Sequence, residues 1–122
     1  MATLTKQEII KKRDKCQQEI FRLQAQKTTD LEQDRISIDD FNQITGRQYT
    51  IQNRLNELNV LLITTAFEKI TVGDNNPGAR LGAAVDQLEQ AIAQLDNMRK
   101  FLDSATSVIN ALSGIIGILV GL

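Results

Sequence analysis

The stretch SIDDFNQITGRQYTIQNRLNELNVLLIT, residues 37–64, carries the strongest structural signal in the chain. Ser37 followed by Asp40 at the third position after it is typical of a helix N-terminus. Beyond that start, mainly apolar residues recur at spacings that alternate between three and four, as in the seam between packed helices. The seam consists of Phe41, Ile44, Gln48, Ile51, Leu55, Leu58, Leu62 and Thr65. The stretch therefore predicts one long amphipathic helix.

The residues on either side show the same helical periodicity and no sustained alternation typical of strands. A first helix is predicted from Thr5, with Glu8 completing a capping box, to about Asp30. Its apolar stripe consists of Ile9, Cys16, Ile20 and Leu23. We expect an all-α fold.

The segment VGDNNPG, residues 72–78, is the clearest break, because Gly73, the Asn residues and Pro77 favour a turn followed by a capped helix. A third helix is predicted from Pro77, with apolar positions at Leu81, Val85, Leu88, Ile92, Leu95 and Leu102. No residue requires it to end before Leu122. As one helix it would be about 69 Å long, longer than the others, so we expect its last third to project or bend back.

These elements predict a long-helix bundle in which helices two and three form an antiparallel hairpin and helix one packs alongside. We divide the chain into a bundle or stalk, residues 1–103, and an apolar C-terminal helical segment, residues 104–122. The heptad-like seams favour self-association into a homo-oligomer.

The segment after Asp103 has 19 residues without a charge, SATSVINALSGIIGILVGL. As a helix it would span about 28 Å, close to the roughly 30 Å hydrocarbon core of a bilayer. Small residues at helical spacing would let another helix approach closely. The membrane-insertion candidates are Val108, Ile109, Leu112, Ile115, Ile116, Ile118, Leu119, Val120 and Leu122. The small-residue stripe is Ser107, Asn110, Gly114, Gly117 and Gly121.

The first helix is basic, with a candidate face of Lys11, Lys12, Arg13, Lys15 and Arg22. Two interpretations remain open. The face contacts anionic lipid head groups or phosphates, or it is a solvated surface paired with the acidic residues 30–40. The net charge of −1 and the lack of aromatic residues among the basic ones give no support to a nucleic-acid partner.

The chain contains no His and a single Cys, Cys16. It therefore lacks the commonest general base and metal ligand, and it cannot form an intramolecular disulfide. We expect no enzymatic activity, no cofactor, no metal and no small-molecule substrate. Cys16 lies on the apolar stripe of helix one, so we expect it to be a buried small hydrophobe.

These observations predict a non-enzymatic helical protein that self-associates and engages membranes through its C-terminal helix, with a pore-forming oligomer as one form. The layout is similar to that of α-helical pore-forming proteins, although no shared motif accompanies the likeness. The alternative is a soluble interaction module, or a polymerising structural subunit, whose C-terminal helix is buried in the core or in an oligomer interface. The charged start predicts no secretory signal, so we expect cytoplasmic synthesis, with membrane association or non-classical export left open.

Overall fold

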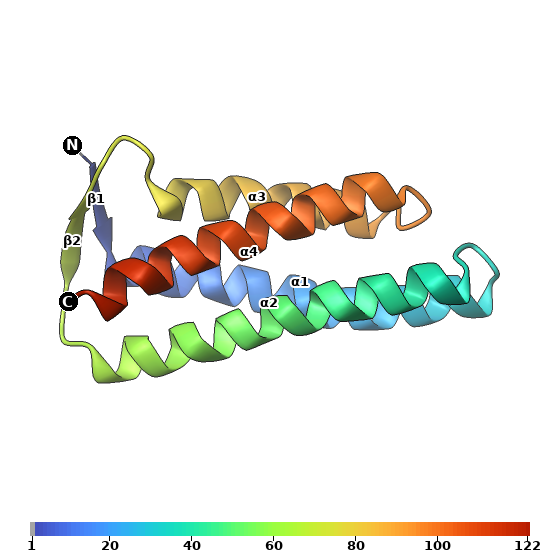
Figure 1. The fold of residues 1–122 in the computed structure, drawn as a ribbon, viewed down its shortest axis with the longest axis horizontal. Helices are drawn as coiled ribbons and strands as arrows, with labels where there is room; N and C mark the ends of the chain where they lie inside the picture. The colour runs from blue at the N-terminus through green and yellow to red at the C-terminus, as the bar shows by residue number, and fades with distance from the viewer. Residues whose placement is uncertain (1) are drawn as a thin grey trace.

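The computed structural model describes residues 2–122 as a bundle of four helices with a two-stranded sheet at one end (Figure 1). The all-α bundle predicted from the periodicity is confirmed. The elements in chain order are β1 (Ala2–Thr5), α1 (Lys6–Glu32), α2 (Ile38–Thr64), β2 (Lys69–Val72), α3 (Pro77–Ile92) and α4 (Met98–Val120).

The first two helices begin where the capping residues predict. Thr5 Oγ1 accepts the backbone N–H of Glu8 at 3.1 Å. Ser37 forms a complete capping box with Asp40. Between the helices the chain reverses over residues 33–37, where Asp34 adopts φ 58°. A short polar side chain tolerates that left-handed conformation, which explains how α1 ends without a Gly or a Pro.

The prediction of one continuous third helix is wrong, because residues 77–122 form the α3–α4 hairpin. Asn97 Oδ1 accepts the backbone N–H of Lys100 at 3.2 Å and so caps α4. Leu95 is buried within the connecting turn. Leu95 therefore packs into the core from a turn, at a position where a continuous helix would also have an apolar residue. For this reason the periodicity alone did not reveal the break.

The prediction that strands are absent is also wrong. Strand β1 pairs antiparallel with β2 in the register Ala2↔Val72 to Thr5↔Lys69. Each strand has only four residues, too few for an alternating pattern to stand out in the sequence. Leu4, Ile70 and Val72 are buried on the inner side of this sheet, so the sheet covers one end of the core.

The helix neighbours differ from the predicted ones. Figure 1 shows α1 and α3 running in one direction and α2 and α4 in the other. Helix α4 packs against α3 and α2, and α1 packs against α2 and α3. The antiparallel hairpins are thus α1–α2 and α3–α4. Helix α2 does not pair with α3 as predicted, because the turn at residues 93–97 brings α4, running parallel to α2, between them.

The core is one cluster to which all six elements contribute. Five predicted seam residues of α2 are buried: Ile44, Ile51, Leu55, Leu58 and Leu62. From α1 the predicted stripe of Ile9, Cys16, Ile20 and Leu23 is buried as well. The largest fully buried side chain is Phe101, in the first turn of α4. Helix α4 is therefore a structural component of the bundle.

Candidate functional site

Helix α4 places its bulky residues on two different sides. Of the membrane-insertion candidates, Val108, Leu112, Ile115 and Leu119 are at most 2% exposed and lie in the core. Ile109, Ile116 and Ile118 are half-buried, and Val120 and Leu122 are exposed. In the folded bundle the inner face of α4 is consequently covered by protein.

The outer face of α4 carries no charge after Asp103. Its exposed positions over the next four turns are small or weakly polar: Thr106, Ser107, Asn110, Ser113 and Gly117. Helix α1, in contrast, exposes many charged residues on its outer side. Among residues 2–122, α4 is the one helix long and apolar enough to cross a membrane, with a mean hydropathy of 1.5 over an 18-residue window.

The small-residue stripe divides into two parts. Ser107 and Asn110 line a shallow groove against α3, together with Arg80, Ala83, Ala84 and Gln87, with a volume of about 310 Å³. Further along, Gly114 faces Pro77 of α3, and a Cβ on Gly114 would lie 3.3 Å from the Cβ of Pro77. A Cβ on Gly117 would meet no atom within 4 Å. Gly117 and Gly121 are exposed to solvent.

One polar contact joins α4 to α2 across the outer surface. Arg54 Nε donates a hydrogen bond to Ser113 Oγ at 3.2 Å, and Arg54 also forms an ion pair with Glu57 of its own helix at 3.1 Å. Both side chains are substantially exposed, so this contact contributes little to stability. Apolar packing, rather than these polar contacts, holds α4 in place.

The predicted basic face is directed mostly toward α3. Lys12 Nζ donates to the carbonyl oxygen of Gly78 at 2.8 Å, and Arg22 donates to the carbonyl oxygen of Glu89 at 3.0 Å. Lys15 forms ion pairs with Asp86 and with Glu89, the latter at 3.3 Å. The hydrogen bonds that the Lys15 ammonium donates to the carboxylates of Asp86 and Glu89 raise the pKa of Lys15.

Pairing of the basic face with the acidic residues 30–40 is therefore not observed. The chain reversal at residues 33–37 lies at the far end of α1, whereas α3 runs beside the basic turns. Arg13 pairs with the adjacent Asp14 at 2.9 Å. Lys11 is exposed and forms no ion pair within the part of the chain that the structure describes.

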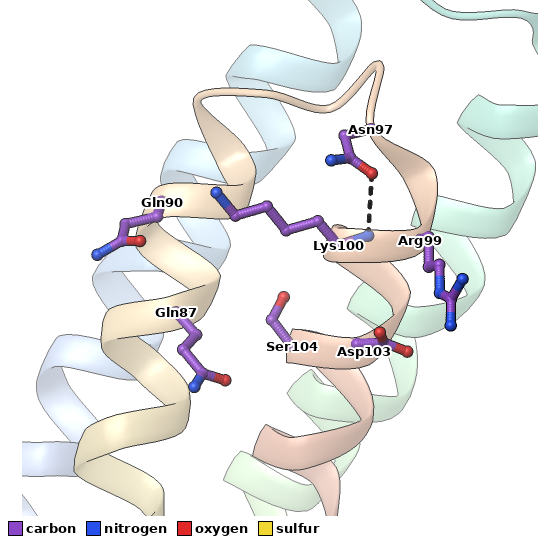
Figure 2. A pocket seen from close by; sticks show the side chains of 7 residues that line it. All are labelled: Gln87, Gln90, Asn97, Arg99, Lys100, Asp103 and Ser104. Carbon is purple, nitrogen blue, oxygen red and sulfur yellow. Dashed lines mark hydrogen bonds between the residues drawn. The ribbon is translucent and has the colours of Figure 1, made fainter.

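A polar groove of about 490 Å³ lies where α3 and α4 meet near their turn (Figure 2). Gln87 and Gln90 line it from α3, and Lys100, Asp103 and Ser104 from α4. The ammonium group of Lys100 reaches toward α3 and donates to Gln94 Oε1 at 3.3 Å. The groove is open and shallow, and its residues do not include a nucleophile held by a general base.

The α1–α2 seam contains polar contacts that the periodicity did not predict. Gln17 and Gln52 exchange hydrogen bonds at 2.7 and 3.0 Å. Lys27, only 3% exposed, donates to Thr45 Oγ1 at 2.8 Å and lies 4.7 Å from the centre of the Phe41 ring. Desolvation by burial lowers the pKa of Lys27. The sequence signal for this buried lysine is its position on the apolar stripe of α1, in line with Cys16 and Leu23.

Cys16 is fully buried, as predicted. Burial, with a smaller effect of the neighbouring Glu19 carboxylate, raises the pKa of its thiol to about 12. A thiol in that state is unreactive at neutral pH, because the thiolate is the nucleophile. Across residues 2–122, no group of three or more His, Cys, Asp or Glu side chains is arranged to hold a metal ion.

No protein-family model matches the chain, and no curated protein or solved structure shows significant similarity to it.

Proposed function

We propose that this protein is a non-enzymatic helical bundle that stores an apolar helix, α4, in its core and transfers it to a membrane when the bundle opens. The observation that carries the proposal is the uncharged outer face of α4 between Asp103 and Leu122. A helix that serves only as a water-soluble core element usually carries charges on its exposed side. Here both sides of the helix are compatible with an apolar environment.

The inner face of α4 meets a similar environment before and after such a transfer. Val108, Leu112, Ile115 and Leu119 would exchange a protein core for hydrocarbon, and both are apolar. The cost of opening therefore comes mainly from the apolar side chains of α2 and α3 that α4 leaves exposed to water. Each large side chain so exposed costs about 1.5–3 kcal/mol. A lipid surface, or closure of the remaining helices, must offset that loss.

The small-residue stripe supports self-association of the inserted helix. Gly114, Gly117 and Gly121 offer little steric bulk, and small residues let helix backbones approach closely, which favours the van der Waals packing that helps helices associate in lipid. Ser107 and Asn110 on the same stripe would then contact a second copy or line a polar lumen. An oligomer of inserted α4 helices is the form in which we expect the membrane to be permeabilised.

A second candidate function is that of a soluble interaction module or structural subunit. This function is favoured by the burial of α4, because a helix with so many buried side chains can remain in the core permanently. The fully buried residues are Phe101, Val108, Leu112 and Ile115, all 0% exposed. In that case the outer face of α4 would contact a second protein and never lipid.

A reversible cross-link distinguishes these two functions. Because a Cβ on Gly114 would lie 3.3 Å from that of Pro77, Pro77→Cys with Gly114→Cys places two sulfurs close to disulfide geometry, where Cβ atoms are roughly 3.5–4.5 Å apart. A Cys16→Ala background prevents mixed pairing. Oxidation ties the C-terminal half of α4 to α3, and a reducing agent releases it.

The assay is leakage of a dye from vesicles of phosphatidylcholine and phosphatidylserine. We expect the reduced protein to release dye and the oxidised protein not to, with release restored on reduction. The Cys16→Ala protein without the added cysteines is the control for the reducing agent. If the reduced protein and this control release no dye, the soluble module is the correct function.

A further inference from the structure

A polar groove of about 260 Å³ lies at the seam between α1 and α2. It is more enclosed than the groove near the α3–α4 turn, and five of its six lining residues belong to α2. None of the six carries a charge: they are Ile20, Gln48, Tyr49, Gln52, Asn53 and Asn56. The groove offers hydrogen bonds and apolar contact without ionic attraction, so it suits a neutral polar ligand.

Hydrogen bonds across the seam hold part of this groove in place. Gln52 exchanges hydrogen bonds with Gln17 of α1, and its Nε2 also donates to Asn56 Oδ1 at 3.0 Å. Gln48 Nε2 donates to Gln24 Oε1 of α1 at 2.8 Å. Because these bonds restrict side-chain rotation, Gln48, Gln52 and Asn56 are oriented before a ligand binds, which lowers the entropic cost of binding.

Other polar groups of the groove are left for a ligand. Within residues 2–122, the hydrogen bonds of the lining side chains involve only Gln48, Gln52 and the Oδ1 atom of Asn56. The Asn53 amide, the Asn56 Nδ2 group and the Tyr49 hydroxyl therefore have no protein partner. Together they can both donate and accept hydrogen bonds without a charge. The hydroxyl groups of a sugar also donate and accept, so they are the matching chemistry.

The two largely exposed aromatic side chains within residues 2–122 both lie at this seam. Tyr49 is 69% exposed and lines the groove. Phe21 is 68% exposed and neighbours Gln17 and Gln24 on the surface of α1, at helical spacings of four and three. The face of an aromatic ring is electrostatically negative, so it attracts the weakly positive C–H groups on the flat side of a sugar ring. An aromatic ring beside free amides can thus contact both the C–H groups and the hydroxyls.

We propose that this groove binds a neutral carbohydrate, with one sugar ring stacked on Tyr49 and its hydroxyls bonded to Asn53 and Asn56. A phosphate or another anion finds no cation among the lining residues. A proline-rich peptide needs a groove lined by several aromatic rings, whereas Tyr49 is the one aromatic residue among the six. The inference goes beyond the proposed function and does not rest on it, because the groove is formed by α1 and α2 and binding requires no reaction.

The single tyrosine makes the test specific to this groove. The chain has one Tyr and no Trp, so the tyrosine fluorescence of the intact protein reports on Tyr49. The probes are the neutral trisaccharides maltotriose, cellotriose, mannotriose and triacetylchitotriose. Asn53→Ala with Asn56→Ala removes two amides from the groove and keeps the fluorescent residue. Asn42→Ala with Gln43→Ala is the matched control, because it removes two exposed amides of α2 that do not line the groove.

We expect a saturable change in tyrosine emission with at least one trisaccharide, and the same dissociation constant by calorimetry. The change at Asn53 and Asn56 should weaken binding about tenfold or more, since two hydrogen-bonding partners are lost. The control pair should leave binding unchanged, and urea unfolding checks that both double variants fold. Absence of saturable binding to all four trisaccharides by both methods would overturn the inference. Equal affinities of the two double variants would do so as well.

Discussion

Gly114 of α4 lies directly against Pro77 of α3, so that a Cβ on the glycine would stand 3.3 Å from the Cβ of the proline. Three residues further along, Gly117 has open space around it. The two glycines belong to the same small-residue stripe but differ in what they do. Gly114 allows α3 and α4 to approach closely within the bundle, whereas Gly117 has no packing role in a single copy.

This difference predicts unequal responses to the same substitution. Gly117→Ala should stabilise the bundle by about 0.5–1 kcal/mol, because Ala has the higher helix propensity and its methyl group meets nothing. Gly114→Ala should show a smaller gain or a loss, because Pro77 must move by a few tenths of an ångström. Urea unfolding of the two variants in parallel measures the difference. Equal stabilisation would contradict the close contact at Gly114.

The burial of α4 predicts unequal responses to truncation of a leucine within the helix and of one just after its end. Leu112 is fully buried, and Leu112→Ala should lower the free energy of unfolding by about 2–5 kcal/mol. Leu122 is 64% exposed, and Leu122→Ala should change the free energy of unfolding by less than about 0.5 kcal/mol. Urea unfolding in the absence of lipid is the measurement. Similar small effects at both positions would mean that α4 is not part of the core in solution.

The cap at Asn97 predicts a specific cost for losing its side chain. Asn97→Ala removes the acceptor for the Lys100 N–H and should destabilise the bundle by about 1 kcal/mol. Asn110→Ala is the control, because Asn110 is an exposed asparagine within α4 that caps no helix. Thermal unfolding followed by circular dichroism compares them. Equal midpoints would argue that α3 and α4 are not separated by a capped turn.

The burial of Lys27 predicts that the stability of the bundle changes with pH in the alkaline range. Desolvation lowers the pKa of Lys27 in the folded state below its ordinary value of 10.5. The folded state therefore binds this proton less strongly than the unfolded state, so its charged form lowers stability at neutral pH. That penalty disappears as the pH rises from the folded-state pKa toward the unfolded value.

Replacement of Lys27 by an apolar residue should consequently stabilise the bundle at neutral pH. We expect Lys27→Met to add on the order of 1 kcal/mol near pH 7, because an unpaired charge no longer has to be buried. The advantage over the unsubstituted protein should shrink as the pH rises toward 10.5, the ordinary pKa of a lysine. Urea unfolding across that range tests this, and a pH-independent difference would show that the charge of Lys27 is not responsible.

Much of the fold was predictable from local sequence signals. Thr5, Ser37 with Asp40, and Asn76 followed by Pro77 all mark helix starts, and the structure confirms each of them. The turn at residues 93–97 was not predictable in the same way, because it contains neither Gly nor Pro and Leu95 continues the apolar spacing. Its sequence signals were the excessive length of a continuous third helix and Asn97, a residue type favoured at helix N-termini.

The candidate site was predictable only in part. The uncharged character of residues 104–122 can be read from the sequence, but not which side of the helix faces the core. That division depends on where α2 and α3 lie, and their positions follow from the missed turn. For the same reason, one of the two interpretations of the basic face, pairing with the acidic residues 30–40, does not hold for Lys12 and Lys15, whose partners lie on α3. Long-range neighbours of a helix face are set by topology, not by local pattern.

Fluorescence can follow the outer face of α4 from the closed bundle into a membrane. An environment-sensitive fluorophore attached at Gly117→Cys, in the Cys16→Ala background, sits where the structure has open space. On vesicles that contain a lipid-borne quencher, we expect a blue-shifted emission that is quenched from within the bilayer. A fluorophore at Gln43→Cys in α2 should remain unquenched. A label at residue 117 that stays in water while the protein is bound to the vesicles would contradict this expectation.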